Sequence, residues 1–290
     1  MGKKILFLVF LVILGGAFLG KKAFLFTPSL QSVPRSTPVR YLVIHSFENS
    51  PKEMLGILHQ YGLSVHYMID SKGKVYALVP EERVAWHAGP SFWAGETVLN
   101  NTSIGIELEH AAFGQTDYPK EQINALEKLV KGILKRHNIR PENIVAHSDI
   151  APEAKMDPGR GFPWKELSQK GIGLWYDLNE SEKLADLSVK ELLSLIGYPT
   201  KGRALEASSW AFRQRFMPEI VPYDDGIAAR GKAMFQARQK ISSFPPQERE
   251  KALTMIPPIY PPNDGTYLTD PDFIKVLRAV AYRYQQARKN

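Results

Sequence analysis

The sequence contains no cysteine. The protein therefore has no disulfide, no cysteine-based zinc site and no thiol nucleophile, and any metal site must be built from His, Asp and Glu. A lipid anchor on an N-terminal cysteine is excluded too, so the chain is not expected to be a lipoprotein.

The sequence also lacks a clustered surplus of positive charge. The formal net charge is +7, but four lysines (3, 4, 21 and 22) flank an apolar start, and without them the surplus is 7 − 4 = +3. No block of Lys and Arg mixed with aromatic residues follows, so nucleic acid is not expected as a partner. With 44% hydrophobic and 23% charged residues over 290 positions, the composition is that of an enzyme-sized globular domain with a smaller companion.

A long apolar run follows the short basic head, at residues 5–20. This layout predicts a signal peptide over residues 1–22 and export to the periplasm of the bacterial envelope. The alternative is an uncleaved anchor that keeps the protein at a membrane, because Lys21 and Lys22 could extend to the lipid headgroups. Residues 23–40, which are rich in proline and small polar residues, are predicted to be a linker.

The apolar periodicity predicts an α/β domain over residues 41–180, with one mixed β-sheet flanked by helices. A hairpin turn is expected at Lys72 and Gly73, and Ser50 and Pro51 are typical of the start of a helix. Strands are predicted at 41–46, 103–110 and 142–148, and helices at 51–61 and 119–137.

The pattern after residue 180 is helical only, which predicts a small all-α domain over residues 186–290. Apolar stripes indicate helices at 188–196, 205–216, 227–241 and 271–287. Proline-rich loops separate the later helices. These loops leave the packing of this domain open.

Three side chains suggest a metal site. His45 and His147 lie at the ends of predicted strands, and Asp157 follows in a Gly- and Pro-rich segment. Two imidazoles and a carboxylate form a ligand set of catalytic zinc, which leaves the fourth position to water. Spacing alone leaves open the alternative of unrelated histidines and an ordinary Asp-Pro-Gly turn.

Several motifs resemble, in order and spacing, the zinc-dependent N-acetylmuramoyl-L-alanine amidases of the AmpD and AmiD type, whose fold is shared with the peptidoglycan recognition proteins. The resemblance covers residues 41–178. With an export signal before it and a helical domain after it, the chain looks more like the AmiD branch. The motifs are "YLVIH", "HYMID", "LVPEERVAWHAGPSFWAGETVLNNTSIGIELEH", "ENIVAHSDIAP", "KMDPGRGFPWKEL" and "GIGLWYD".

The resemblance implies that His45, His147 and Asp157 bind Zn²⁺. It also implies that Glu107 is the catalytic carboxylate, which moves a proton from water to the departing amine, and that Lys155 stabilises the developing oxyanion. The alternatives are a solvated strand residue for Glu107 and an ordinary loop residue for Lys155. Glu109, on the same face of the strand as Glu107, is the better candidate for a solvated residue.

Further residues are predicted around the substrate. Trp86, His87, Trp93 and Asn101 are expected to line its groove, and core packing is the alternative for both tryptophans. We expect three other histidines on the surface or at helix ends: 59, 110 and 137. The helical domain resembles a divergent peptidoglycan-binding module in places, and the alternative is a domain that only packs against the catalytic one.

The predicted function is zinc-dependent hydrolysis of the amide between N-acetylmuramic acid, or its anhydro form, and L-alanine in peptidoglycan, in turnover or recycling of the cell wall. The expected partners are peptidoglycan and muropeptides, and we expect a monomer. Two alternatives stay open. One is a non-catalytic peptidoglycan receptor on the same fold, and the other is a metallopeptidase that cuts within the stem peptide.

Overall fold

The computed structural model describes residues 30–111, 114–222, 226–242 and 266–289, together with 244–245, 248, 252, 255–257 and 259–260. The apolar run at residues 5–20, predicted to be a signal peptide or anchor, lies outside these residues. Within the described part of the chain, no helix has both the length and the apolar character needed to cross a bilayer.

A five-stranded mixed sheet forms the centre of the molecule, in the order β4-β3-β6-β2-β7. Strands β3, β6, β2 and β7 run parallel, and β4 pairs antiparallel with β3 through the predicted hairpin. The mixed α/β fold predicted from the sequence is confirmed. The strands are β2 (Tyr41–Phe47), β3 (Tyr67–Ile69), β4 (Val75–Ala77), β6 (Ser103–Glu109) and β7 (Ile144–Ala146).

One face of the sheet is covered by the long helix α3 (Lys120–His137). Leu42 and Ile44 of β2 lie on this face, and they pack in one core with Leu126 and Val130 of α3. The helical stripe and the alternation of the strand match each other here, because both bury every apolar residue that faces the other element. The face is therefore mainly apolar, and the buried Gln122 of α3 donates to the carbonyl oxygens of Ile69 and Glu109 at its end.

The opposite face is interrupted by polar residues. Val43 packs at one end against the C-terminal helices, and Phe47 packs at the other end beneath α1 (Pro51–Gln60). His45 lies between them on the same face, since side chains alternate along a strand. Glu107 of β6 is its partner in the parallel register. A polar gap is thus left between two apolar clusters.

Residues 30–40, predicted as the end of a linker, belong to the folded body. Strand β1 (Ser32–Pro34) pairs antiparallel with β5 (Arg83–Ala85). The guanidinium of Arg35 explains why this segment is held, because it donates hydrogen bonds to the carbonyl oxygens of Glu81, Asn101, Arg83 and Ser103 at 2.5–3.0 Å. The sequence alone did not indicate this use of an arginine.

Short helices connect the strands and approach the site. They are α2 (Leu99–Thr102), η1 (Pro141–Asn143), α4 (His147–Ile150), α5 (Trp164–Ser168) and η2 (Leu178–Glu180). Strand β7 ends at Ala146, so His147 is the first residue of α4. The predicted strand at 142–148 is therefore shorter than expected.

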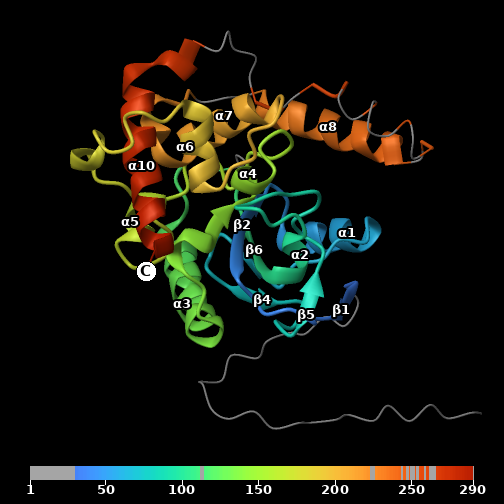
Figure 1. Cartoon of the computed structure of the whole chain (residues 1–290). Helices are drawn as coiled ribbons and strands as arrows, with labels where there is room; N and C mark the ends of the chain where they lie inside the picture. Colours follow the sequence, from blue (N-terminus) through green and yellow to red (C-terminus); the bar gives the residue numbers. More distant parts are fainter. Residues whose placement is uncertain are drawn as a thin grey trace, which may run out of the picture.

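The C-terminal region is helical, as predicted. Its helices α6, α7 and α10 share one core with Val43 and Val145 of the sheet, and α8 packs on α7 through a smaller cluster. Figure 1 shows these helices gathered on one side of the sheet, with α8 extending away from α10. The elements are α6 (Val189–Ile196), α7 (Ala204–Phe216), η3 (Pro218–Ile220), α8 (Ile227–Ser242), η4 (Thr266–Thr269) and α10 (Pro271–Lys289).

Candidate metal centre and active site

His45, His147 and Asp157 come together at one edge of the sheet. The Nδ1 atoms of the two histidines are 2.8 Å apart. Asp157 Oδ2 lies 2.9 Å from His147 Nδ1 and 3.4 Å from His45 Nδ1. His45 is 1% exposed, His147 4% and the Asp157 side chain 14%, so the two rings are buried and the carboxylate is largely shielded from water.

The topology explains this convergence. Strands β2 and β7 are adjacent and parallel, so the carboxyl end of β2 lies beside the start of α4. The loop that carries Asp157 is held against α4 by a hydrogen bond from Ser148 N to the Asp157 carbonyl oxygen, at 2.9 Å. Residues far apart in the chain therefore reach one point.

The donor chemistry fits a cation. Burial, with the neighbouring His147, lowers the pKa of His45 to about 4, and burial lowers the pKa of His147 as well. Burial alone would raise the pKa of Asp157, but contact with the two histidines holds it well below its usual range. Two neutral imidazoles and an ionised carboxylate, with ligand atoms this close together, can present lone pairs to one cation. Zn²⁺ accepts this ligand set.

Glu107 lies beside the metal ligands and is 8% exposed. Among the residues that the structure describes, its Oε2 atom has no hydrogen-bond partner. Burial and the charge of Asp157 raise the pKa of Glu107 to about 8, against the opposing charge of Lys155. A buried carboxyl with an unpartnered oxygen and a pKa raised to about 8 is suited to proton transfer.

Lys155 is half-buried on the loop that leads to Asp157. Its backbone N–H donates to the carbonyl oxygen of Ala151 at 3.0 Å, which fixes the loop near α4. Its charge acts on the pKa values of His45, His147 and Glu107. The structure thus brings both predicted catalytic side chains to the predicted ligands.

The residues predicted to line the substrate groove lie in different surroundings from one another. The His87 ring lies against the metal ligand His45, with 3.0 Å between His87 Nδ1 and His45 Nε2. Trp86 is half-buried, whereas Trp93 is fully buried and packs on Tyr198 in the core. Asn101 accepts hydrogen bonds on its carbonyl oxygen from the segment at residues 35–37.

Two residues near the site were missed by the sequence reasoning. Asn100 Oδ1 accepts from the backbone N–H groups of both His87 and Ala88. Ser103 Oγ lies 3.3 Å from His87 Nε2. Asn100 lies in the short helix α2 and Ser103 begins β6, and both are small polar residues of a kind common in turns, so no signal in a single sequence singles them out.

His110 was expected at the surface, but it is buried, with 6% exposed. Its Nδ1 accepts from Gly114 N at 3.0 Å, and its ring packs on Tyr118. The expectation was wrong because a histidine can be buried where a backbone donor satisfies its ring nitrogen.

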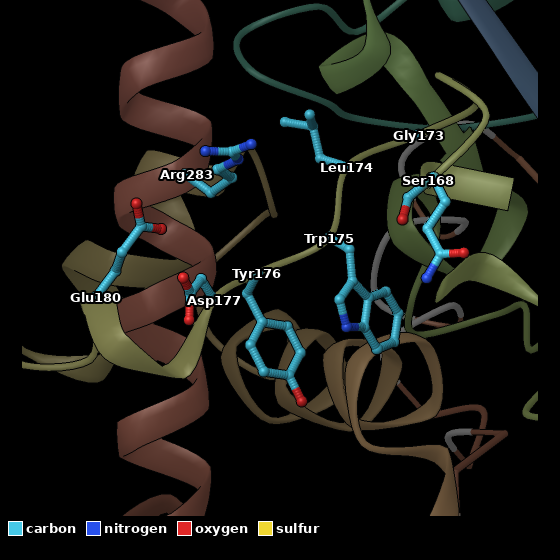
Figure 2. A pocket seen from close by; sticks show the side chains of 9 residues that line it. Ser168, Gly173, Leu174, Trp175, Tyr176, Asp177, Glu180 and Arg283 are labelled. Atoms are coloured by element: carbon cyan, nitrogen blue, oxygen red, sulfur yellow. The ribbon is translucent and has the colours of Figure 1, made fainter. Parts of the chain in front are cut away.

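A separate hollow of about 310 Å³ lies where the segment at residues 173–177 meets α10. Figure 2 shows Trp175 and Tyr176 on that segment, with Arg283 on α10. The two aromatic rings stack with their centroids 5.2 Å apart. None of the residues that line the hollow belongs to the metal centre.

Comparison with known proteins identifies the family. The family model described as N-acetylmuramoyl-L-alanine amidase matches residues 35–160. The chain is 36% identical over 227 residues to N-acetylmuramoyl-L-alanine amidase AmiD of Escherichia coli (strain K12), which spans 69% of this chain and 82% of that protein. The chain belongs to the N-acetylmuramoyl-L-alanine amidase family. The resemblance to amidases of the AmpD and AmiD type is therefore confirmed.

Other relatives match a smaller or a similar share of this amidase. The 1,6-anhydro-N-acetylmuramyl-L-alanine amidase AmpD of Enterobacter cloacae is 41% identical over 105 residues, which span 36% of this chain and 55% of that protein. The solved complex of E. coli AmiD with the substrate anhydro-N-acetylmuramic acid-L-Ala-D-gamma-Glu-L-Lys matches with a TM-score of 0.62 and 30% identity, over 87% of this chain and 92% of that one.

A second solved relative is AmpDh3 of Pseudomonas aeruginosa in complex with anhydromuramic pentapeptide. It matches this amidase with a TM-score of 0.57 and 37% identity, over 64% of this chain and 85% of that one. Both relatives were solved with anhydromuramyl peptides bound.

Proposed function

We propose that this amidase uses a zinc ion held by His45, His147 and Asp157 to hydrolyse the amide between the lactyl group of N-acetylmuramic acid, or its anhydro form, and L-alanine. The observation that carries the proposal is the convergence of three lone-pair donors beside a buried Glu107. When bound, zinc would supply a Lewis acid that polarises the carbonyl and lowers the pKa of water.

The protein side chains have separate tasks in this reaction. The unpartnered Oε2 of Glu107 takes the proton of the attacking water and returns it to the departing amine of L-alanine. Lys155 places a fixed positive charge where the carbonyl oxygen becomes negative. Burial of His45 and His147 excludes bulk water, which strengthens both effects.

Export and peptidoglycan binding complete the proposal. The apolar start of the chain supports action outside the cytoplasm, with a cleaved signal or a retained anchor as the two forms. The relatives solved with anhydromuramyl peptides support muropeptides as substrates. We further propose that the helical region contributes to binding of the polymer.

A variant of Glu107 tests the mechanism on purified muropeptide. The substitution Glu107→Gln should lower kcat by about 100- to 10,000-fold, because the proton carrier is lost, and should leave zinc bound. Glu109→Gln is the matched control, since Glu109 lies two residues along the same strand and accepts from Ser71 N. A Glu107→Gln protein as fast as the wild type would remove Glu107 from the mechanism.

The mass of the products separates the alternatives. An amidase releases a stem peptide that begins with L-alanine and leaves a sugar without peptide. A metallopeptidase would leave L-alanine attached to the sugar, and a receptor would release no peptide. Either of these outcomes would overturn the proposed reaction.

A further inference from the structure

The two histidine ligands are both supported by one short segment. The second ring nitrogen of His45, Nε2, lies 3.0 Å from His87 Nδ1. The second ring nitrogen of His147, also Nε2, lies 3.3 Å from the carbonyl oxygen of the next residue, Ala88. We infer that His87 and Ala88 form an outer support that determines which nitrogen of each ligand faces the metal. This inference rests on the metal site of the proposed function.

The tautomer of His147 follows from its partner. A carbonyl oxygen only accepts hydrogen bonds, so it pairs with His147 when the hydrogen lies on Nε2 and is donated to Ala88. The Asp157 carboxylate, 2.9 Å from Nδ1, then shares the metal with that nitrogen. Nδ1 is then left with a free lone pair. That atom is the one that faces His45 and Asp157.

The tautomer of His45 is set by a longer chain of hydrogen bonds that ends at a carbonyl. The Ser103 hydroxyl donates its single hydrogen to the Leu99 carbonyl oxygen, at 2.5 Å. Ser103 Oγ can therefore only accept from His87 Nε2, 3.3 Å away. The hydrogen of His87 is thereby placed on Nε2.

With its hydrogen on Nε2, His87 has a lone pair on Nδ1. That atom accepts the hydrogen of His45 Nε2, which leaves His45 Nδ1 free for the metal. A single carbonyl oxygen thus fixes the direction of every hydrogen bond up to the ligand. Outer partners of this kind orient a histidine and raise its basicity.

The support itself is held in place. Asn100 Oδ1 accepts from His87 N at 3.0 Å and from Ala88 N at 2.8 Å, so one side chain fixes the backbone of both residues. The ring of His87 lies over Gly105 of β6, where an added Cβ would come within 2.6 Å of the ring. Gly105 therefore leaves the space that the ring needs between the sheet and His45.

Zinc affinity of the full-length protein tests the inference, measured on metal-free protein by competition with a chelator. His87→Leu removes the acceptor for His45 and should weaken zinc binding about 10- to 100-fold. His87→Asn keeps an acceptor near the former Nδ1 position and should restore most of the affinity. If His87 only packs, both variants will bind zinc as the wild type does, and this result would overturn the inference.

The wild type is measured first, to separate the proposed zinc site from the role of His87. A wild-type protein that binds no zinc would contradict the proposed function. A wild-type protein that binds zinc with the same affinity as both variants would contradict the role of His87. Should His87→Leu not fold, as judged by denaturation of the metal-free protein, Ser103→Ala replaces it, because this change removes only a hydroxyl. It should also weaken zinc binding, by less than His87→Leu does. ¹⁵N NMR of the zinc-bound wild type should show the hydrogen on Nε2 of His45, His87 and His147. A hydrogen on Nδ1 of either ligand would contradict the inference.

Discussion

Two aspartates on the segment after β7 are both shielded from water, but their carboxylates contact different kinds of atoms. Asp149, in α4, is fully buried and accepts from Tyr198 OH at 2.5 Å, from Ala146 N at 2.8 Å and from the guanidinium of Arg215. Asp157, in the loop that follows, faces ring nitrogens of His45 and His147. One acid contacts hydroxyl, backbone and guanidinium donors, and the other contacts ring nitrogens that can also bind a metal.

The difference separates a structural acid from a metal ligand. Donors that surround Asp149 offset the cost of burying its charge. Tyr198 and Arg215 belong to the helical region, so this region holds α4, whose first residue is His147. Arg215 also donates to the Ile144 carbonyl oxygen of β7 and lies over the Trp164 ring. The helical region therefore stabilises the edge of the sheet on which the metal site is built.

The largest effect is expected from substitution of Asp157, the aspartate that faces the metal site. Asp157→Asn should abolish zinc binding and lower activity by roughly 1000-fold, equivalent to about 4 kcal/mol of transition-state stabilisation. The metal-free variant should be less stable than the metal-free wild type, because contact with the two histidines stabilises the charge of Asp157. Zinc content, hydrolysis of muropeptide and urea unfolding measure the three effects. Retained zinc would break the assignment.

The next largest effect is expected at the buried ion pair of Asp149. Arg215→Met leaves Asp149 buried without its ion-pair partner and should lower the free energy of unfolding by about 3–5 kcal/mol. Arg213→Met is the matched control on the same helix, since Arg213 pairs with the more exposed Asp270, and it should cost about 1 kcal/mol or less. Equal losses in the two variants, measured by urea unfolding, would remove the special role of the buried pair.

A third carboxylate, Glu81, extends the comparison to pH. Burial would raise its pKa, but hydrogen bonds from Arg136, Tyr67 and His137 lower it to about 2. Because this folded-state pKa lies below the ordinary value of 4.5, the stabilisation is complete above that value and is lost as the pH falls from 4.5 towards 2. Glu81→Gln should lose less stability over this range than the wild type. Parallel pH profiles of unfolding would contradict this.

The smallest effect is expected on the surface of α3. Lys131, whose side chain is about half exposed, pairs with Glu127 one turn away. Exposed pairs of this kind gain little, because water screens the charges and the long side chains lose freedom. Lys131→Met should leave the unfolding midpoint within error of the wild type. A clearly lower unfolding midpoint would contradict the expectation that this exposed ion pair contributes little.

The fold was largely predictable because its signals are local. The Ser50 cap and the apolar stripe of residues 120–137 predicted their helices to within a residue, and the strand at 103–109 followed from its alternation. The order of strands and the incorporation of residues 30–40 were not predictable. The incorporation of residues 30–40 depends on hydrogen bonds of Arg35 to carbonyl groups far along the chain.

The candidate site was predictable in its residue types and not in its surroundings. Resemblance to the family singled out His45, His147 and Asp157, and the structure brings them together. It did not indicate that His87 contacts a ligand or that Asn100, and not Asn101, holds its backbone. Hydrogen-bond direction depends on which acceptor is within 3 Å, and this is a property of the folded chain.

The sequence by itself determined the helices, the strands, the absence of thiol chemistry and the set of residues able to bind zinc, because each of these depends on residue type or on neighbours along the chain. The tertiary structure decided which of two similar aspartates serves the metal and which one joins the helical region to the sheet. Their roles differ only in the atoms that packing brings within hydrogen-bonding distance, and residues from distant segments supply those atoms.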